Sequence, residues 1–158
     1  GFPVSDEGGG AALGLAALQR ALRSWDGRAE ANNFTRDVLG RFDDPSTLAT
    51  WIGDATATDY ATFAPIVVKH AATGDSDARD LMSQSGARIA ELAQALFMLG
   101  VRRVALSGGL AEHVAPYLPS EVRERLSAPK SDAMAGGILL ARKRLAAMQT
   151  PADSVKTI

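Results

Sequence analysis

The sequence contains no cysteine and only two histidines, His70 and His113. Without cysteine, this chain forms no disulfide, no thiolate metal site and no iron–sulfur cluster, and it has no cysteine nucleophile. Two histidines far apart in the sequence also argue against a histidine-based metal centre. A lone histidine such as His70, near the end of a helical stretch, is more typical of a packed or capping residue than of a ligand. We therefore expect no metal site made by this chain alone.

An excess of charge of either sign is also missing. The 158 residues include 17 basic and 18 acidic side chains, which gives a net charge of -1. Nucleic acids and anionic membranes attract proteins that carry clustered positive charge. The balance therefore predicts neither a nucleic-acid nor a membrane partner, and it leaves small molecules as candidate ligands.

Long apolar runs are missing as well. No uninterrupted run approaches the roughly 20 residues that cross a bilayer, and no segment resembles a signal peptide. A cytoplasmic location is the resulting expectation. The chain opens at Gly1-Phe2-Pro3 rather than at a methionine, and a glycine-rich loop follows almost at once. We therefore also expect an upstream part that precedes this chain.

What is present suits a folded domain that is mainly helical. Hydrophobic residues make up 46% of the sequence and charged residues 22%, as in a globular protein with a core. Leu15, Leu18 and Leu22 recur at helical spacing. Helices are predicted at residues 11–23, 33–42, 46–51, 76–99 and 111–117, with one further turn at 121–126. Ser46 is the predicted N-cap of the helix at 46–51. Two more helices are predicted from their caps: one begins at Thr58 or Asp59 and has Phe63, Val67 and Ala71 on one face, and the last begins at Ser131 or Asp132.

Two of these helices have apolar faces that should pack on a core. The stripe on the longest helix is formed by Ile89, Leu92, Ala93, Leu96 and Leu99. The stripe on the last helix is formed by Met134, Ile138, Ala141, Leu145 and Met148. Gly136 and Gly137 lie inside the last helix, where each costs about 1 kcal/mol relative to alanine. Their presence predicts close backbone contact with another element or a ligand.

Only two strands are predicted, at residues 103–107 and 126–129. Two parallel strands do not form a stable buried sheet by themselves. Either the protein is mostly helical, or the other strands of its sheet precede Gly1.

Two glycine-rich turns are candidates for ligand contact. Gly8-Gly9-Gly10 follows the acids Asp6 and Glu7, and Gly108-Gly109 follows the first predicted strand. Glycine pairs let another molecule approach the main chain, and a helix that starts there offers free amide groups. Each turn by itself is also an ordinary connection or a solvated loop.

Four segments taken together resemble one family. They are Gly1 to Ala11 (Gly-Phe-Pro-Val-Ser-Asp-Glu-Gly-Gly-Gly-Ala), Ala71-Ala72-Thr73-Gly74-Asp75 before a long helix, Val104 to Ala111 (Val-Ala-Leu-Ser-Gly-Gly-Leu-Ala), and Asp132-Ala133-Met134-Ala135-Gly136-Gly137. In this order they are similar to the C-terminal half of the N-acetylglucosamine kinase and BadF-type ATPase family, which belongs to the actin, sugar kinase and Hsp70 superfamily.

The resemblance implies an α/β, helix-dominated fold. Residues 1–149 would form the C-terminal domain of a bilobal protein, a partial ribonuclease H-like (actin-like ATPase) domain that lacks its first strands, and 150–158 would form a flexible tail. The two lobes would close on ATP and a sugar. The catalytic acid, the phosphate-binding turns and most of the Mg²⁺ ligands would come from the N-terminal domain, so this chain would contain no catalytic residue and would be inactive alone.

The resemblance also implies site residues. Asp6 would bind sugar hydroxyls, with the Gly1 backbone beside it, and a carboxylate suits hydroxyls because it accepts more than one hydrogen bond. Gly108 and Gly109 would contact the adenosine of ATP, flanked by Ala71 and His113, and the helix with Gly136 and Gly137 would pack under the nucleotide. The family pattern Gly-Asp-Glu-Gly-Ser-Gly departs here at Ser5 and Gly9, which keeps the turn but loses a hydroxyl at position 9.

The leading hypothesis is therefore a kinase of N-acetylglucosamine or glucosamine. One alternative is an ATPase that activates a radical dehydratase or reductase, but such activators hold an iron–sulfur cluster through cysteines. Another is a non-catalytic helical interaction domain, in which the glycine turns only permit packing. The apolar helix faces would serve a homodimer or the missing lobe equally well.

Overall fold

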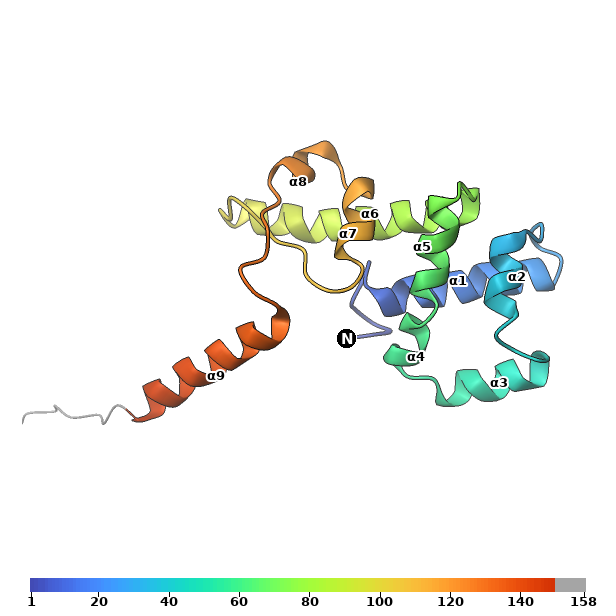
Figure 1. Ribbon diagram of the computed structural model, residues 1–158, viewed down its shortest axis with the longest axis horizontal. Helices are drawn as coiled ribbons and strands as arrows, with labels where there is room; N and C mark the ends of the chain where they lie inside the picture. Colours follow the sequence, from blue (N-terminus) through green and yellow to red (C-terminus); the bar gives the residue numbers. More distant parts are fainter. Residues whose placement is uncertain (150–158) are drawn as a thin grey trace, which may run out of the picture.

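The computed structural model describes residues 1–149, and the predicted tail at 150–158 lies outside the described residues. Figure 1 shows that helices dominate this part of the chain. They are α1 (Gly10–Trp25), α2 (Asn33–Leu39), α3 (Pro45–Asp54), α4 (Ala57–Ala61), α5 (Ala64–Ala72), α6 (Ser76–Met98), α7 (Ala111–Val114), the 3-10 turn η1 (Ala115–Tyr117), α8 (Ser120–Glu124) and α9 (Ala133–Gln149).

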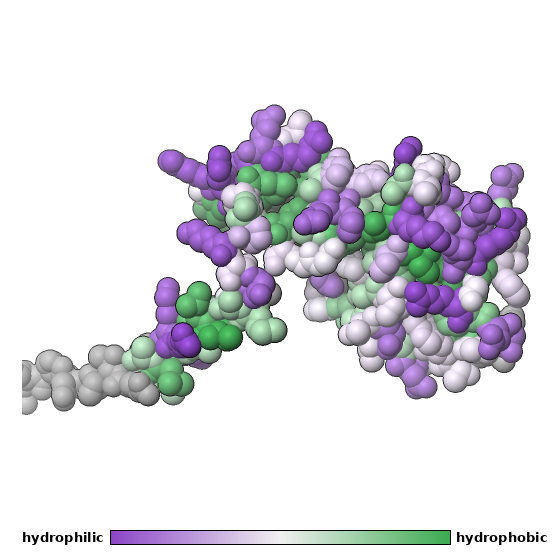
Figure 2. Space-filling model, viewed as in Figure 1, coloured by the Kyte–Doolittle hydropathy of each residue, from purple (hydrophilic) through white to green (hydrophobic). Residues whose placement is uncertain are grey.

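Helix α9 extends away from the other helices (Figure 1). Its apolar side chains are exposed, with Met134, Ile138, Leu145 and Met148 at 76%, 49%, 60% and 79% of their full accessibility. Figure 2 shows green, hydrophobic atoms along this arm. A Cβ atom added to Gly136 or Gly137 would meet no atom within 4 Å. The predicted close packing of this helix is therefore wrong for the described residues, which provide no element to cover it.

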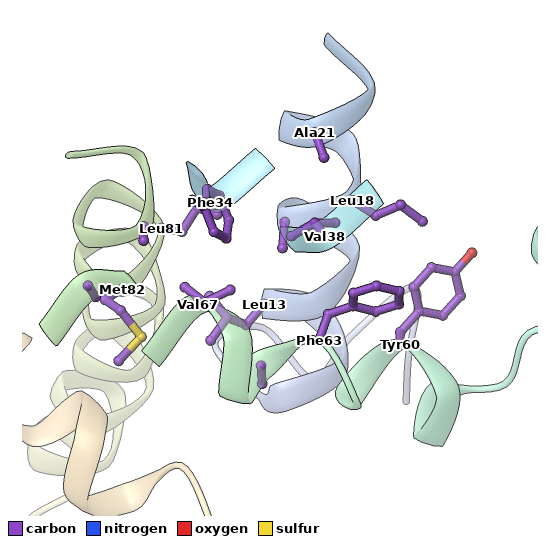
Figure 3. Close-up of a cluster of buried hydrophobic side chains, with 14 of the residues drawn as sticks. Leu13, Leu18, Ala21, Phe34, Val38, Tyr60, Phe63, Val67, Leu81 and Met82 are labelled. Carbon is purple, nitrogen blue, oxygen red and sulfur yellow. The ribbon is translucent and has the colours of Figure 1, made fainter. Parts of the chain in front are cut away.

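The hydrophobic core lies between α1, α2, α4, α5 and the first half of α6. Its largest fully buried side chains include Phe34, Phe63, Leu18, Met82 and Val38. Figure 3 shows them converging from these helices. Helix α1 is central because α2, α4, α5 and α6 all contact it. The predicted face of Phe63, Val67 and Ala71 on α5 is confirmed, since all three are buried in this core.

Helix starts depend on side chains that accept hydrogen bonds from free backbone N–H groups. Two predicted caps are wrong by a few residues. The N–H of Thr47 donates to Asp44 Oδ1 at 2.9 Å, so Asp44 rather than Ser46 caps α3. The single helix predicted to begin at Thr58 or Asp59 forms as two, α4 and α5. Thr56 caps α4, with Asp59 completing a capping box, and Phe63 is the N-cap of α5, which has the face of Val67 and Ala71. At α9 the prediction of Asp132 is confirmed, because its Oδ1 accepts from Ala135 N at 2.8 Å.

The apolar stripe on α6 is only partly buried. Ala93 is in contact with a second, smaller core that Ala90, Leu118 and Val122 complete. Leu92, Leu96 and Leu99, however, are 59%, 44% and 82% exposed. The prediction that the whole stripe packs on a core is therefore wrong for its outer leucines within the described chain.

The two predicted strands reduce to one isolated parallel bridge between Val104 and Leu126. Val104 N donates to Arg125 O at 3.1 Å, and Ser127 N donates to Val104 O at 2.9 Å. The Arg125 side chain donates to the carbonyls of Arg102 and Val101 and so holds the segment after α6 in place. Longer strands do not form within residues 1–149, because a parallel pair needs further strands and covering layers.

No helix among residues 1–149 has both the length and the apolar composition needed to cross a membrane.

Candidate ligand-binding cleft

A cleft of about 810 Å³ is lined by Ile89 of α6 and by three further segments that are far apart in the sequence. These segments are the N-terminal loop, the α4–α5 region and the stretch that leads from the Val104 bridge into α7. The lining residues are Asp6, Glu7, Gly8, Gly9, Gly10, Ala61, Ala64, Pro65, Val68, Lys69, Ile89, Ala105, Leu106, Ser107, Gly108, Gly109, Leu110, Ala111, His113 and Val114.

The N-terminal loop is held tightly against α6. Gly8 has a φ of +79°, and the buried Ser85 Oγ donates to its carbonyl oxygen at 2.7 Å. A Cβ atom at Gly8 would lie 2.8 Å from Ser85 O, so only glycine allows this approach. Asp6 also has a positive φ, 75°, a conformation that aspartate tolerates better than most residues. The carboxyl groups of Asp6 and Glu7 are thereby exposed on a rigid turn at the edge of the cleft.

The turn at Gly108-Gly109 leaves its main chain open to the cleft. Gly108 has a φ of +107°, and a Cβ atom at either glycine would meet nothing within 4 Å. Ala111 N donates to Gly108 O at 3.1 Å, which closes the turn into α7. Behind it, the fully buried Val114 anchors α7 in the core. A ligand can therefore approach the backbone of this turn closely.

Helix α5 supplies a wall that is apolar along Pro65 and Val68 and cationic at Lys69. Lys69 Nζ donates to Asp37 Oδ2 at 3.0 Å, and the same oxygen lies 2.8 Å from His70 Nε2. The hydrogen bond with His70, followed by that with Lys69, holds the pKa of Asp37 below its usual value. The His70 ring is buried beside Phe34, with 5.7 Å between ring centroids, which confirms the prediction of a packed histidine.

The cleft contains four of the six predicted site residues: Asp6, Gly108, Gly109 and His113. The other two do not line it. Gly1 lies in an outer turn, where its carbonyl accepts from Val4 N and Ser5 N at 3.1 and 2.9 Å. Ala71 is 3% exposed and faces the core, while its carbonyl accepts from Arg79 Nε at 3.1 Å.

Sequence reasoning missed the α5 wall of the cleft. Pro65, Val68 and Lys69 follow one another at helical spacing, beside the buried face of Val67 and Ala71. Once the core face of α5 was assigned, the same periodicity placed these three side chains on the neighbouring face. The signal was therefore present, but only the fold shows that this face meets the two glycine turns.

The chemistry of the cleft suits a polar molecule with a ring that rests on an apolar wall. Carboxylates accept hydrogen bonds from hydroxyl groups, and open backbone lets a planar group approach closely. Among residues 1–149 no group of three or more histidine, cysteine, aspartate or glutamate side chains could hold a metal ion.

Comparison with known proteins defines the class of this chain. The model of the BadF/BadG/BcrA/BcrD ATPase family matches residues 1–141, and the chain belongs to this family. It is 34% identical over 143 residues to the glucosamine kinase GspK of Vibrio cholerae. It is also similar to the crystal structure of a Chromobacterium violaceum protein described as an N-acetylglucosamine kinase, with 37% identity and a TM-score of 0.80. The resemblance predicted from the sequence motifs is thereby confirmed.

The chain spans about half the length of these relatives. It is aligned over 90% of its own residues with 49% of the Vibrio cholerae protein, and over 89% with 49% of the Chromobacterium violaceum chain. The relatives therefore contain a part of similar size that has no counterpart in these 158 residues.

Proposed function

We propose that this chain is the C-terminal, nucleotide- and sugar-binding half of an ATP-dependent amino-sugar kinase. The observation that carries the proposal is the cleft, which joins the acidic glycine loop at Asp6 to the Gly108-Gly109 turn. These are the two segments that the kinase resemblance assigns to the sugar and to adenosine. The similarity to proteins named as glucosamine and N-acetylglucosamine kinases supports the same substrates.

In this proposal Asp6 accepts hydrogen bonds from sugar hydroxyls. The backbone of Gly1, which does not line the cleft, supports the loop that contains Asp6 through its bonds with Val4 and Ser5. The adenosine rests against the Gly108-Gly109 turn, with His113 at its edge. Ala71 supports the α5 wall of the cleft indirectly, because it packs α5 on the core. Rigid support suits such contacts, since a site that is loose by about 1 Å loses much of its effect.

The fold that fits this role is the C-terminal lobe of an actin-like ATPase, formed by residues 1–149. The single bridge between Val104 and Leu126 would then be the edge of a ribonuclease H-like sheet whose first strands precede Gly1. The N-terminal lobe would supply the catalytic acid, the phosphate turns and most ligands of the Mg²⁺ ion. Mg²⁺ commonly binds through substrate phosphates and one or two carboxylates.

The proposal is tested with the full-length protein and a coupled assay of ADP release. We expect ATP-dependent phosphorylation of glucosamine or N-acetylglucosamine, and mass spectrometry of the product decides between them. Asp6→Asn keeps the backbone geometry but replaces a hydroxyl acceptor by a donor, so we expect KM for the sugar to rise about tenfold or more. The matched control is Asp54→Asn, on α3 and outside the cleft.

Absence of hexosamine phosphorylation by the full-length protein would overturn the proposal. ATP hydrolysis without sugar phosphorylation would instead favour an ATPase activator, the alternative within the family. Absence of any nucleotide binding would favour an interaction domain.

A further inference from the structure

Lys69 is the one permanently cationic side chain among the described residues that line the cleft. The other lining groups that carry charge are the carboxylates of Asp6 and Glu7, and His113 is charged only when protonated. A nucleotide with a phosphate chain brings several negative charges into the same space. Lys69 is therefore the lining group that can offset them with a full positive charge.

We propose that Lys69 binds the phosphate chain of the nucleotide and thereby distinguishes ATP and ADP from adenosine. This inference rests on the proposed function, because it requires that the cleft accepts a nucleotide. It adds a phosphate contact from the C-terminal half to those expected from the other lobe.

The position of Lys69 favours this role. Its backbone lies on α5 between Val68, which lines the cleft, and His70, which is buried. Its side chain is 69% exposed, and its Nζ lies 3.0 Å from Asp37 Oδ2. Asp37 lies on α2 and does not line the cleft, so the flexible stem of Lys69 has to direct the ammonium group towards the cleft to reach a ligand there.

The ion pair with Asp37 does not compete strongly with a phosphate. An ammonium group has three N–H donors, so Lys69 can keep one bond to Asp37 and direct others to a ligand. If Lys69 leaves altogether, the Asp37 carboxylate keeps its hydrogen bond with His70 at 2.8 Å. Exposed ion pairs are weak, and a phosphate oxygen is a stronger partner for a cation.

The test measures the affinity of the full-length protein for ATP, ADP and adenosine by titration calorimetry. For Lys69→Met we expect the affinity for ATP and ADP to fall about tenfold, the size expected for one charged hydrogen bond, while the affinity for adenosine stays unchanged. Lys69→Arg should restore most of the affinity for ATP. The matched control is Lys130→Met, which removes an equal charge at an exposed position outside the cleft and before α9, and should change none of the three affinities.

Asp37→Asn separates ligand binding from a structural role. If Lys69 binds phosphate, Asp37→Asn frees its ammonium group, and the affinity for ATP stays equal or rises. If Lys69 only ties α5 to α2, Asp37→Asn and Lys69→Met lower the affinities for ATP and adenosine alike, and the inference is overturned. If the wild type binds ATP and Lys69→Met binds it with the same affinity, the inference about Lys69 is overturned but the proposed function is not. No binding of ATP or adenosine by the wild type overturns the proposed function with it.

Discussion

Gly14 lets α1 and α4 pack with their backbones in direct contact. A Cβ atom at this position would lie 1.8 Å from the carbonyl oxygen of Tyr60 and 2.7 Å from its carbonyl carbon. Both atoms belong to the backbone of α4, so no side-chain rotation relieves the clash. One residue without a side chain thus determines the distance between two elements of the core.

We expect Gly14→Ala to lower the free energy of unfolding by about 1–3 kcal/mol, the usual cost of overpacking a core. Urea denaturation of the full-length protein, followed by circular dichroism, measures it. Gly53→Ala is the control, because it lies in α3 and an added Cβ would meet nothing within 4 Å. It should stabilise the protein by up to about 1 kcal/mol through helix propensity. Equal effects of the two substitutions would contradict the role of the α1–α4 contact.

Asp37 couples stability to pH through its bonds with His70 and Lys69. These bonds hold its pKa below the usual value, so the fold favours the ionised carboxylate. Such a group contributes stability above the pKa of the unfolded chain, near pH 4, and loses the contribution as the pH falls through its pKa in the folded protein. Asp37→Asn should therefore lower Tm at pH 7, and the difference from the wild type should shrink as the pH falls below about 4 and through the lowered pKa of Asp37 in the folded protein.

Thermal denaturation of both proteins at several pH values provides the measurement. Asp54→Asn, an exposed acid on α3, serves as the control and should show no such pH-dependent difference. A deficit of Asp37→Asn that is the same at pH 7 and pH 3 would show that the carboxylate charge is not responsible.

Helix α6 supports two of the walls of the cleft through two adjacent residues. Ser85 binds the carbonyl of Gly8 in the N-terminal loop. Gly86 admits the backbone of Tyr117, since a Cβ atom there would lie 2.6 Å from Tyr117 O. Tyr117 ends η1, which continues α7 and the Gly108-Gly109 turn. The distance between the N-terminal loop and the Gly108-Gly109 turn therefore depends on these two adjacent residues of α6.

Substitutions of Ser85 and Gly86 should raise the KM values of the proposed kinase for different substrates. Ser85→Ala leaves a buried carbonyl without its donor, at a cost of about 1–3 kcal/mol, and we expect a rise of KM mainly for the sugar. Gly86→Ala displaces η1, and we expect a rise of KM mainly for ATP, by several-fold as for a core overpacked by about 1 kcal/mol. Steady-state kinetics with each substrate varied in turn tests this. Equal changes of both KM values in both variants would contradict separate supports.

At the scale of the whole molecule, the described residues leave a large apolar surface uncovered. The exposed side chains of α9 include Leu139 and Leu140, at 57% and 70% of full accessibility. Leu92 on α6 and Leu99, which follows α6, are also exposed. Figure 2 shows hydrophobic atoms at the surface of the α9 arm. Single exposed apolar residues are ordinary, but a concentration on one helix marks a contact surface. The relatives are about twice as long, so the part of them without a counterpart in this chain is available to cover such a surface.

We expect the 158-residue chain, expressed by itself, to bind a hydrophobic dye such as ANS more strongly per mole than the full-length protein does. It should also fail to phosphorylate hexosamines, because the proposed catalytic acid lies in the other half. A version that ends at Lys130 removes α9 and should lose much of the dye fluorescence. Equal fluorescence of the 158-residue and full-length proteins would contradict the prediction of a covered surface.

Local pattern was enough to predict the helices and part of the cleft. The helical spacing of Leu15, Leu18 and Leu22 predicts a helix that packs this face on the core, and the spacing of Phe63, Val67 and Ala71 does the same. The predicted faces that do not pack as expected are the outer residues of the α6 stripe and the face of α9. The motifs around Asp6 and Gly108-Gly109 predict the segments that meet in the cleft. These features depend on residues within one or two turns of each other, so local sequence is sufficient to specify them.

Which faces meet depends on long-range packing. It places Lys69 in the cleft and Ala71 in the core, and it leaves the predicted strands as one bridge at Val104. Burial and strand pairing depend on partners far along the chain, or outside it, and no local spacing specifies them. The family and the helices could therefore be predicted from the sequence, whereas the α5 wall and the exposed face of α9 follow from long-range contacts.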